Sequence, residues 1–289
     1  MATRGWEVRR LVPSDMSALA AFASRQGWPH RETEWRRLLD LGGEGCFCAS
    51  RAGHDAIIGT VTSVVYGDAA LAWLGMMLVD VNHRRQGVGT ALMTACLQHM
   101  HKLGVPRVML DATDAGQPLY EKFGFRALYR VHRWQGQATE FFGRRSRRLK
   151  TVDMRAVIAF DELRFGVGRG RVLLHLQAEF PRLCWIDRDK RGRVQGYLFA
   201  RREGARVIIG PWVHDSPWAA TTLLHTAMGA VRGTDITVFL PDCNLAATPI
   251  AQDHALRAIS HTTRMIWGDA EPPDGWPASI FGVTSLALG

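Results

Sequence analysis

The segment Arg84–Thr90 combines residue types suited to binding phosphate. It reads Arg-Arg-Gln-Gly-Val-Gly-Thr and lies between an apolar run, Leu71–Val79, and a stretch with helical hydrophobic spacing. Gly87 and Gly89 remove side chains where the backbone turns into the helix, so free N–H groups are exposed at the positive end of the helix dipole. Such an arrangement binds phosphate or pyrophosphate, and the two leading arginines add positive charge.

The common nucleotide-binding motifs do not account for this segment. A Walker A loop requires GxxxxGK[ST], which the chain lacks, and a dinucleotide fingerprint would need glycine at position 92, where Leu92 stands. Two glycines before a helix, taken alone, are also compatible with a tight strand-to-helix turn. A second motif is needed to decide between these interpretations.

That second motif is Pro118-Leu119-Tyr120-Glu121-Lys122-Phe123-Gly124-Phe125, which follows the next apolar strand. With both motifs present, the sequence resembles the GNAT (GCN5-related N-acetyltransferase) superfamily across residues 5–135. The family pattern [Q/R]-x-x-G-x-[G/A] is matched by Arg84, Gly87 and Gly89. The downstream family pattern is matched by Leu119, Tyr120, Gly124 and Phe125.

The resemblance implies acetyl-CoA as cosubstrate and assigns residues to it. The pyrophosphate would be held by the segment Arg84, Arg85, Gln86, Gly87, Val88, Gly89 and Thr90. The strand end at Leu78 and Val79 would pair with the pantetheine arm in a splayed gap of the sheet. Thr113 stands where the family has asparagine, and its hydroxyl can still bond a pantetheine amide.

Tyr120 is the candidate catalytic residue that the resemblance places near the thioester sulfur. A tyrosine has an ordinary pKa of about 10, so it stays protonated at neutral pH and can donate to a leaving thiolate. The alternative role is a half-buried aromatic ring that packs beside Phe123. The expected reaction is direct attack of an amine on the acetyl carbonyl in a ternary complex.

The sequence departs from the family at the general base. The usual glutamate of the central strand is missing, because Trp73–Val79 carries no carboxylate. Asp111 lies two residues before Thr113 on the same strand face and is a candidate base. A structural hydrogen-bonding role for Asp111, or a water relay in its place, is the alternative.

The acceptor cleft is expected near Gln26–Arg31, since the family builds it from the early helices and the later hairpin. Trp28 could stack on a substrate, and Arg31 could hold a carboxylate or phosphate. The alternative is an ordinary interhelical loop with Trp28 in the core. No HExxH motif or zinc-type His/Cys spacing occurs, so no metal is expected.

The order of strands and helices predicts a mixed α/β chain with two tandem GNAT-like domains, each a twisted, mostly antiparallel sheet flanked by helices. Residues 1–138 form the first domain, 139–152 a basic linker and 153–289 a degenerate copy. In that copy Gly210–Ala219 takes the place of the phosphate segment, but Pro217 removes an N–H group and Trp218 fills space. Ile280–Leu288 is expected to be a last strand, either within its own domain or crossing to the first.

Composition sets further limits on function. The net charge of +9 favours anionic partners, although an Arg-rich solvated surface would give the same value. The basic run Gly143–Lys150 lacks interleaved aromatic residues, so a linker is favoured over a nucleic-acid site. Five cysteines without CxxC, no secretion signal and no apolar membrane span indicate a soluble protein of the cytoplasm.

These observations lead to one hypothesis and one alternative. We expect a GNAT N-acetyltransferase that uses a small-molecule primary amine, because a second domain would partly enclose the cleft. The alternative, prompted by the missing strand carboxylate, is a non-catalytic acetyl-CoA sensor or interaction module.

Overall fold

The computed structural model describes residues 5–28, 30–51, 56–141, 143 and 145–289. The N-terminal half contains strands β1 (Trp6–Arg10), β2 (Phe47–Arg51), β3 (Ile57–Tyr66), β4 (Leu71–Val79), β5 (Val108–Ala112) and β6 (Phe125–Gln137). Its helices are α1 (Met16–Arg25), α2 (Glu32–Gly42), α3 (Val88–Lys102) and α4 (Gln117–Lys122).

The C-terminal half repeats this order of elements. Its strands are β7 (Arg147–Arg148), β8 (Cys184–Arg188), β9 (Val194–Glu203), β10 (Arg206–His214), β11 (Asp235–Pro241), β12 (Arg257–Trp267) and β13 (Ile280–Gly282). Its helices are α5 (Met154–Phe165), α6 (Gly170–Glu179), α7 (Pro217–Ala230) and α8 (Ala247–Asp253). The repetition agrees with the expected pair of related α/β units.

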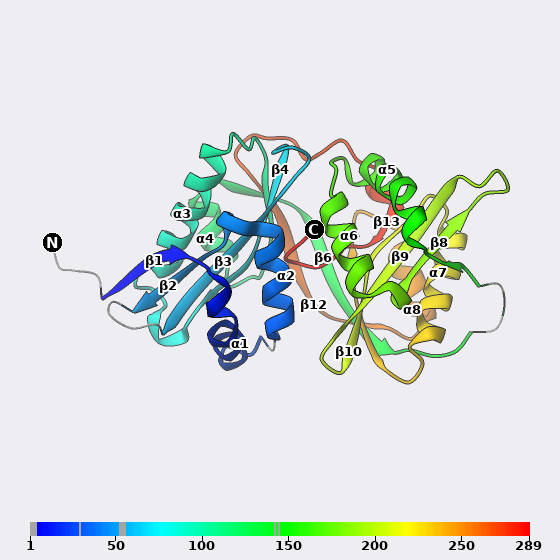
Figure 1. Cartoon of the computed structure of the whole chain (residues 1–289), viewed down its shortest axis with the longest axis horizontal. Coiled ribbons are helices and arrows are strands. Elements are labelled where there is room, and N and C mark those ends of the chain that lie inside the picture. The colour runs from blue at the N-terminus through cyan, green and yellow to red at the C-terminus, as the bar shows by residue number, and fades with distance from the viewer. Residues whose placement is uncertain (1–4, 29, 52–55, 142, 144) are drawn as a thin grey trace.

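The two halves share one sheet because two long strands lie between them. The strand order is β1-β2-β3-β4-β5-β12-β6-β11-β10-β9-β8-β7, with β13 paired to β10. Strand β12 therefore separates β5 from β6, and β6 in turn pairs with β11 of the C-terminal half. Figure 1 shows β6 and β12 in the middle, between the two lobes. A boundary near residue 138 therefore divides the chain in sequence, but one continuous sheet runs through both halves.

The helices pack on both faces of this sheet through buried apolar side chains. One buried cluster, here called the shared core, joins residues of α1, α2, α5 and α6 from both halves. The opposite face is covered by α3 and α4 in the N-terminal half and by α7 and α8 in the C-terminal half. Across the shared core, Arg37 of α2 forms a 2.7 Å ion pair with Glu179 of α6.

One expectation about the C-terminal segment needs correction, and the basic run contains a short strand. Arg147–Arg148 form β7 and pair with β8; Arg144 of the same basic run lies outside the described residues. The last strand ends at Gly282 instead of continuing to Leu288. Residues 284–289 instead close into a turn in which the Gly289 amide donates to the Ser285 carbonyl at 3.0 Å.

That turn, here called the C-terminal turn (residues 284–289), packs against the N-terminal half. The Trp73 indole donates to the Leu286 carbonyl at 3.2 Å, and the Tyr66 hydroxyl donates to the Leu288 carbonyl at 2.9 Å. Leu288 is buried by this contact. The C-terminal half therefore reaches the central strands of the N-terminal half directly.

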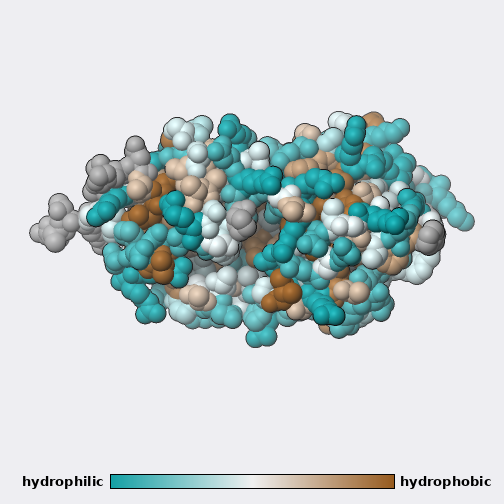
Figure 2. Space-filling model, turned by 90° about the horizontal axis from the view of Figure 1, so that it is seen from below, coloured by the Kyte–Doolittle hydropathy of each residue, from teal (hydrophilic) through white to brown (hydrophobic). Residues whose placement is uncertain are grey.

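The surface is mostly hydrophilic on the face seen in Figure 2, where apolar residues gather only in small separate patches. None of the helices in the described part of the chain has the length and apolar composition needed to span a bilayer.

Candidate functional site

The Arg84–Thr90 segment forms an exposed loop between β4 and α3. Helix α3 begins at Val88, and Gly87 caps it in the left-handed conformation with φ of 84°. Arg85 also adopts a left-handed conformation, with φ of 60°. The first N–H groups of a helix lack intrahelical acceptors, so the amides that follow Gly87 are available to an anion.

Side chains of the loop hold its shape. Arg84 donates through Nε to the Val79 carbonyl at 3.1 Å, and Gln86 donates to the Asn82 carbonyl at 2.9 Å. A Cβ on Gly89 would lie 3.2 Å from Leu119 of α4, so α3 and α4 approach closely there. The loop is thereby fixed beside the helix that carries Tyr120.

The expected splay in the sheet lies directly before this loop. Strands β4 and β5 pair in parallel only from Ala72↔Val108 to Leu74↔Leu110, although β4 continues to Val79. Beyond that point β4 has a bulge opposite β3, where Met76 adopts a left-handed φ of 50°. A left-handed conformation costs a non-glycine residue roughly 1–2 kcal/mol, and such strain gathers at functional sites. The edge of β4 that faces β5 therefore has no strand partner beyond Leu74, although Leu78 and Val79 still pair with β3 and the Val79 carbonyl accepts from Arg84.

Tyr120 lies on the α3 side of the gap. It is 7% exposed, its ring meets Phe125 edge-on at 6.0 Å, and Phe123 packs against the same apolar cluster. Burial raises the pKa of its hydroxyl, so the phenol stays protonated at neutral pH. Within the described residues no hydrogen bond contributes to the shift of its pKa, so the hydroxyl is able to donate to a ligand.

Thr113 is exposed and follows the end of β5, and both its hydroxyl and the Tyr120 ring lie next to Gly116. Its hydroxyl accepts a 3.2 Å hydrogen bond from the Gly116 amide and so helps to start α4. A hydroxyl has a second lone pair and its own proton, so the expected pantetheine bond remains chemically possible.

Asp111 serves the structural role that was the alternative to a catalytic base. Both of its oxygens accept from Arg264 of β12, at 3.0 and 2.9 Å, and both side chains are buried. The Arg264 guanidinium also lies 4.4 Å from the Trp73 ring and donates to the Tyr129 hydroxyl at 3.1 Å. The pair joins β5 to the strand inserted from the other half.

Changing Asp111 to asparagine is expected to destabilise the whole chain by about 3–5 kcal/mol, because the buried Arg264 charge loses its partner. Denaturant unfolding of the purified variant measures this loss. The matched double variant Asp111→Leu with Arg264→Met removes both charges and should recover much of it. Equal stability of the wild type and Asp111→Asn would contradict the structural role.

The expected acceptor loop faces the C-terminal half. Trp28 is 36% exposed, so it is not the core residue of the alternative interpretation, and its ring lies 6.2 Å from that of His30. Pro29 lies outside the described residues. The Arg31 guanidinium lies 3.7 Å from the place a Cβ on Gly204 would take, in the hairpin between β9 and β10.

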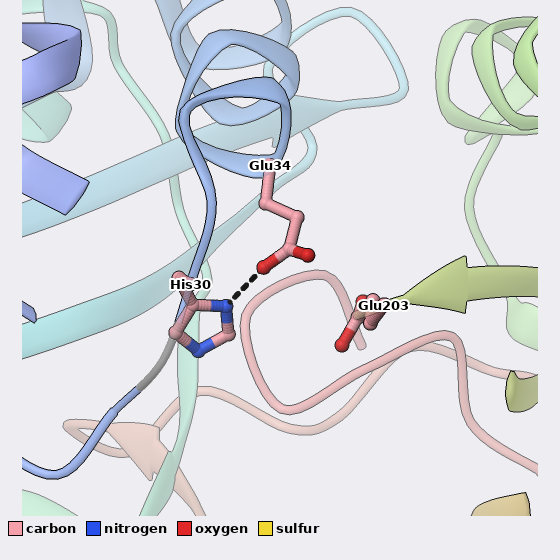
Figure 3. A group of neighbouring side chains, drawn as sticks. All are labelled: His30, Glu34 and Glu203. Carbon is pink, nitrogen blue, oxygen red and sulfur yellow. Dashed lines mark hydrogen bonds and ion pairs between the residues drawn. The ribbon is translucent and has the colours of Figure 1, made fainter. Parts of the chain in front are cut away.

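Beside Arg31, a polar cluster bridges the two halves. His30 Nδ1 lies 2.8 Å from Glu34 Oε2, and Glu203 faces them from the end of β9 (Figure 3). The three ligand-type atoms lie within 4.8 Å of one another and could hold a cation. However, Arg201 of the same strand already pairs with Glu203 at 2.6 Å, so its positive charge competes with a cation for this carboxylate.

The C-terminal half has a helix start, at α7, in the place that corresponds to the start of α3, and its residues differ. Helix α7 begins with Pro217, so it offers one fewer N–H group at its N-terminus. The expectation that Trp218 fills space there is wrong, because its side chain is 72% exposed. Its position on the first turn of α7 directs it to solvent.

Sequence reasoning missed the residues on the opposite face of β4. A Cβ on Gly75 would lie 2.6 Å from both Cα and Cβ of Ala287, so the C-terminal turn occupies the space beside this strand. Thr62 of β3 is the cross-strand partner of Gly75. The available signal was a glycine within an otherwise apolar strand, which often marks a close approach of another backbone.

Comparison with known families agrees with this geometry. Residues 14–125 match the model described as "Acetyltransferase (GNAT) family", and residues 157–282 match one described as "Acetyltransferase (GNAT) domain". Both halves are therefore similar to the same kind of domain.

Individual proteins give the same result. The chain is 25% identical to the uncharacterized N-acetyltransferase YitH of Bacillus subtilis over 78% of this chain and 79% of that protein. A glucosamine 6-phosphate N-acetyltransferase of Trypanosoma brucei brucei is 30% identical over 28% of this chain and 57% of that protein. A putative acetyltransferase structure from Pyrococcus horikoshii superposes with a TM-score of 0.82 at 23% identity, covering 100% of this chain and 98% of that one.

Proposed function

Because this chain belongs to the GNAT family of N-acetyltransferases, we propose that its N-terminal half moves the acetyl group of acetyl-CoA to a small-molecule primary amine. One observation carries this proposal: the exposed N–H groups before α3 and the splayed end of β4 are consecutive in the chain. The first suits a pyrophosphate, and the second suits the amide-bearing arm attached to it.

In the proposed reaction the neutral amine attacks the acetyl carbon in a ternary complex. A C–N bond forms, the C–S bond breaks, and the departing thiolate takes the proton of Tyr120. The nitrogen then sheds one proton, which restores the Tyr120 phenol. The raised pKa of this hydroxyl keeps the phenol protonated at neutral pH, and it makes full transfer to the sulfur depend on the nitrogen proton that replaces it.

A small acceptor is favoured by the enclosure of the other face of β4. The C-terminal turn lies against Trp73 and Gly75, and the Gln26–Arg31 loop meets the β9–β10 hairpin at Glu203. The similarity to a protein named for acting on glucosamine 6-phosphate points the same way. Trp28 and Arg31 are the proposed contacts for the non-reacting part of the acceptor.

The test is release of free thiol from acetyl-CoA over a panel of primary amines, using the purified full chain. Turnover with a saturable amine supports the proposal. Tight coenzyme A binding without turnover on any amine would instead support the acetyl-CoA sensor, which the absence of a carboxylate on β4 favours. Steeply salt-dependent binding to DNA or RNA would indicate a nucleic-acid partner.

Changing Gly75 to alanine is expected to lower amine turnover about tenfold or more, and stability by about 1–3 kcal/mol. The new methyl group would collide with the backbone of Ala287, which cannot move without disturbing the bonds from Trp73 and Tyr66. Steady-state kinetics and thermal unfolding measure both effects. Gly229→Ala on α7, where a Cβ meets nothing within 4 Å, is the control and should retain activity.

A further inference from the structure

The proposed reaction needs a group that takes a proton from the acceptor amine. A primary amine has an ordinary pKa of about 10, so at neutral pH it is mostly a cation that cannot attack a carbonyl carbon. Strand β4 carries no carboxylate, and Asp111 is buried with both oxygens bound to Arg264. The base must therefore come from another element that borders the gap beside β4.

The loop between α1 and α2 is anchored at the far end of this gap. Gln26 Nε2 donates to Asp80 Oδ2 at 3.0 Å, and Asp80 directly follows β4. His30 stands four positions after Gln26, so at most about 14 Å of extended chain separates their Cα atoms. The loop also turns back between them, because the Trp28 amide donates to the Ala23 carbonyl and the His30 amide to the Trp28 carbonyl.

The groups that face His30 from the C-terminal half are tied to the near end of the same gap. Glu203 faces His30 from β9 (Figure 3), and it pairs with Arg201. Arg201 also donates to the Thr284 carbonyl at 2.6 Å, and the C-terminal turn that starts there lies against Gly75 of β4. Short contacts therefore connect the surroundings of His30 to both ends of the β4 segment that lacks a β5 partner.

His30 and Glu34 form a hydrogen-bonded pair that fixes the imidazole ring. His30 Nδ1 lies 2.8 Å from Glu34 Oε2, which also accepts from the Arg31 amide at 3.3 Å, and the Glu34 side chain is 7% exposed. A carboxylate can only accept here, so it holds a proton on Nδ1 and leaves the lone pair on Nε2. The His30 side chain is 28% exposed, and Nε2 lies on the side of the ring away from Glu34 (Figure 3). A ligand or a water molecule can therefore reach this nitrogen.

The charges of the cluster favour proton transfer over metal binding. Burial raises the pKa of Glu203, but the charge and hydrogen bond of Arg201 outweigh it, so this pKa lies below its ordinary value. Because Arg201 already neutralises Glu203, His30 and Glu34 alone remain as ligands, fewer than the three protein ligands of catalytic zinc sites. The charged groups around His30 come from three elements: Glu34 and Arg37 of α2, Glu203 and Arg201 of β9, and Arg31 of its own loop.

We propose that His30 is the catalytic general base, with Nε2 taking a proton from the acceptor ammonium group directly or through one water molecule, and that Glu34 is its positioning residue. The inference rests on the proposed acetyl transfer at this gap. The ammonium N–H bond breaks, its electron pair stays on nitrogen, and the proton passes to Nε2 and then to solvent. The neutral amine attacks the acetyl carbon, after which Tyr120 acts on the thiolate as described above.

The two faces of the sheet separate the base from the acid. The His30 loop joins α1 to α2, and both helices belong to the shared core together with Leu288 of the C-terminal turn. Tyr120 belongs to the cluster of α3 on the opposite face. The amine therefore loses its proton on one face, and the thiolate receives one from the other.

The test is the pH dependence of kcat/KM for the best amine of the panel, measured from about pH 7.5 to about pH 9.5 with saturating acetyl-CoA. The variants His30→Gln and His30→Asn keep an N–H group for Glu34 but have no basic nitrogen. Without a base only the neutral amine in solution reacts, and its fraction rises about tenfold per pH unit below the pKa of the amine. We expect the variants to lose about 100-fold at the lower pH and to regain about tenfold per pH unit, whereas the wild type varies little.

Two further variants separate this role from a structural one. His175 of α6 is the matched control, because it lies 3.9 Å from Glu179 in the same i,i+4 arrangement and is 32% exposed. His175→Gln should keep the kcat/KM of the wild type at every pH. Glu34→Gln should show the same pH pattern as His30→Gln, because its amide can donate to Nδ1 and so select the other tautomer. Thermal unfolding of each purified variant is measured alongside.

Unchanged amine kinetics in a folded His30→Gln protein, or a loss that is the same at every pH, would overturn the inference and leave the proposed function intact. Loss of wild-type turnover with a chelator, restored by zinc, would also overturn it, since the cluster would then hold a metal. The pH pattern of Glu34→Gln decides the matter if the variants at position 30 do not fold. Absence of wild-type turnover on every amine would overturn the proposed function itself, so the failures are distinguishable.

Discussion

Changing Gly87 to alanine is expected to weaken acetyl-CoA binding about 100-fold, equivalent to losing two charge-assisted hydrogen bonds. Gly87 caps α3 with φ of 84°, a conformation that costs other residues roughly 1–2 kcal/mol. Alanine would relax toward a right-handed conformation and turn the following amides away from the pyrophosphate. Calorimetric titration of the purified variant with coenzyme A measures the loss.

The same helix provides a matched control at its other end. Gly104 also adopts a left-handed φ, of 69°, and a Cβ there meets nothing within 4 Å, as at Gly87. Gly104→Ala should therefore suffer a similar loss of stability but bind coenzyme A normally. If both variants bound it with equal affinity, the assignment of the pyrophosphate to this loop would be contradicted.

Local patterns predict the elements that position the candidate site. The helix expected after the turn at Arg84–Thr90 is α3, because hydrophobic spacing and glycine punctuation act within a few residues. The Arg84–Thr90 segment combines such signals, so its two glycines were informative without a structure.

Each half places its last long strand in the part of the sheet built by the other half: β12 pairs with β5, and β6 pairs with β11. Local sequence patterns could not predict this arrangement. Strand pairing joins residues far apart in the chain, and the apolar pattern of Phe125–Gln137 does not specify which neighbours it will have. The pairing is stabilised by contacts such as the ion pair of Asp111 with Arg264. The sequence does not indicate that these two residues are partners. Asp111 was therefore open to interpretation as a base.

The C-terminal turn illustrates the same limit. The segment Val283-Thr-Ser-Leu-Ala-Leu has the composition of a strand. As a turn, however, it buries Leu288 and presents the Leu286 and Leu288 carbonyls to Trp73 and Tyr66. The packing of this segment against the N-terminal half therefore outweighs its local preference for a strand. The close approach of Ala287 to Gly75 follows from this packing, so it became visible only in the folded chain.

Changing Tyr120 to phenylalanine is expected to lower kcat for amine acetylation by about 10²-fold or more, since a positioned general acid contributes 10²–10⁴-fold. Coenzyme A affinity should stay near that of the wild type, because the phenyl ring still packs on Phe125. Single-turnover thiol release and calorimetric titration separate the two effects.

A second buried tyrosine tests whether this loss is specific. Tyr197 of β9 bonds Asp161 in the C-terminal half, so Tyr197→Phe should reduce the unfolding temperature while kcat is retained. Because the Tyr120 hydroxyl has no partner in the described residues, Tyr120→Phe should show the opposite combination, normal stability with slow chemistry. A Tyr120→Phe enzyme with unchanged kcat would remove the general acid from the mechanism and leave thiolate departure unassisted at this gap.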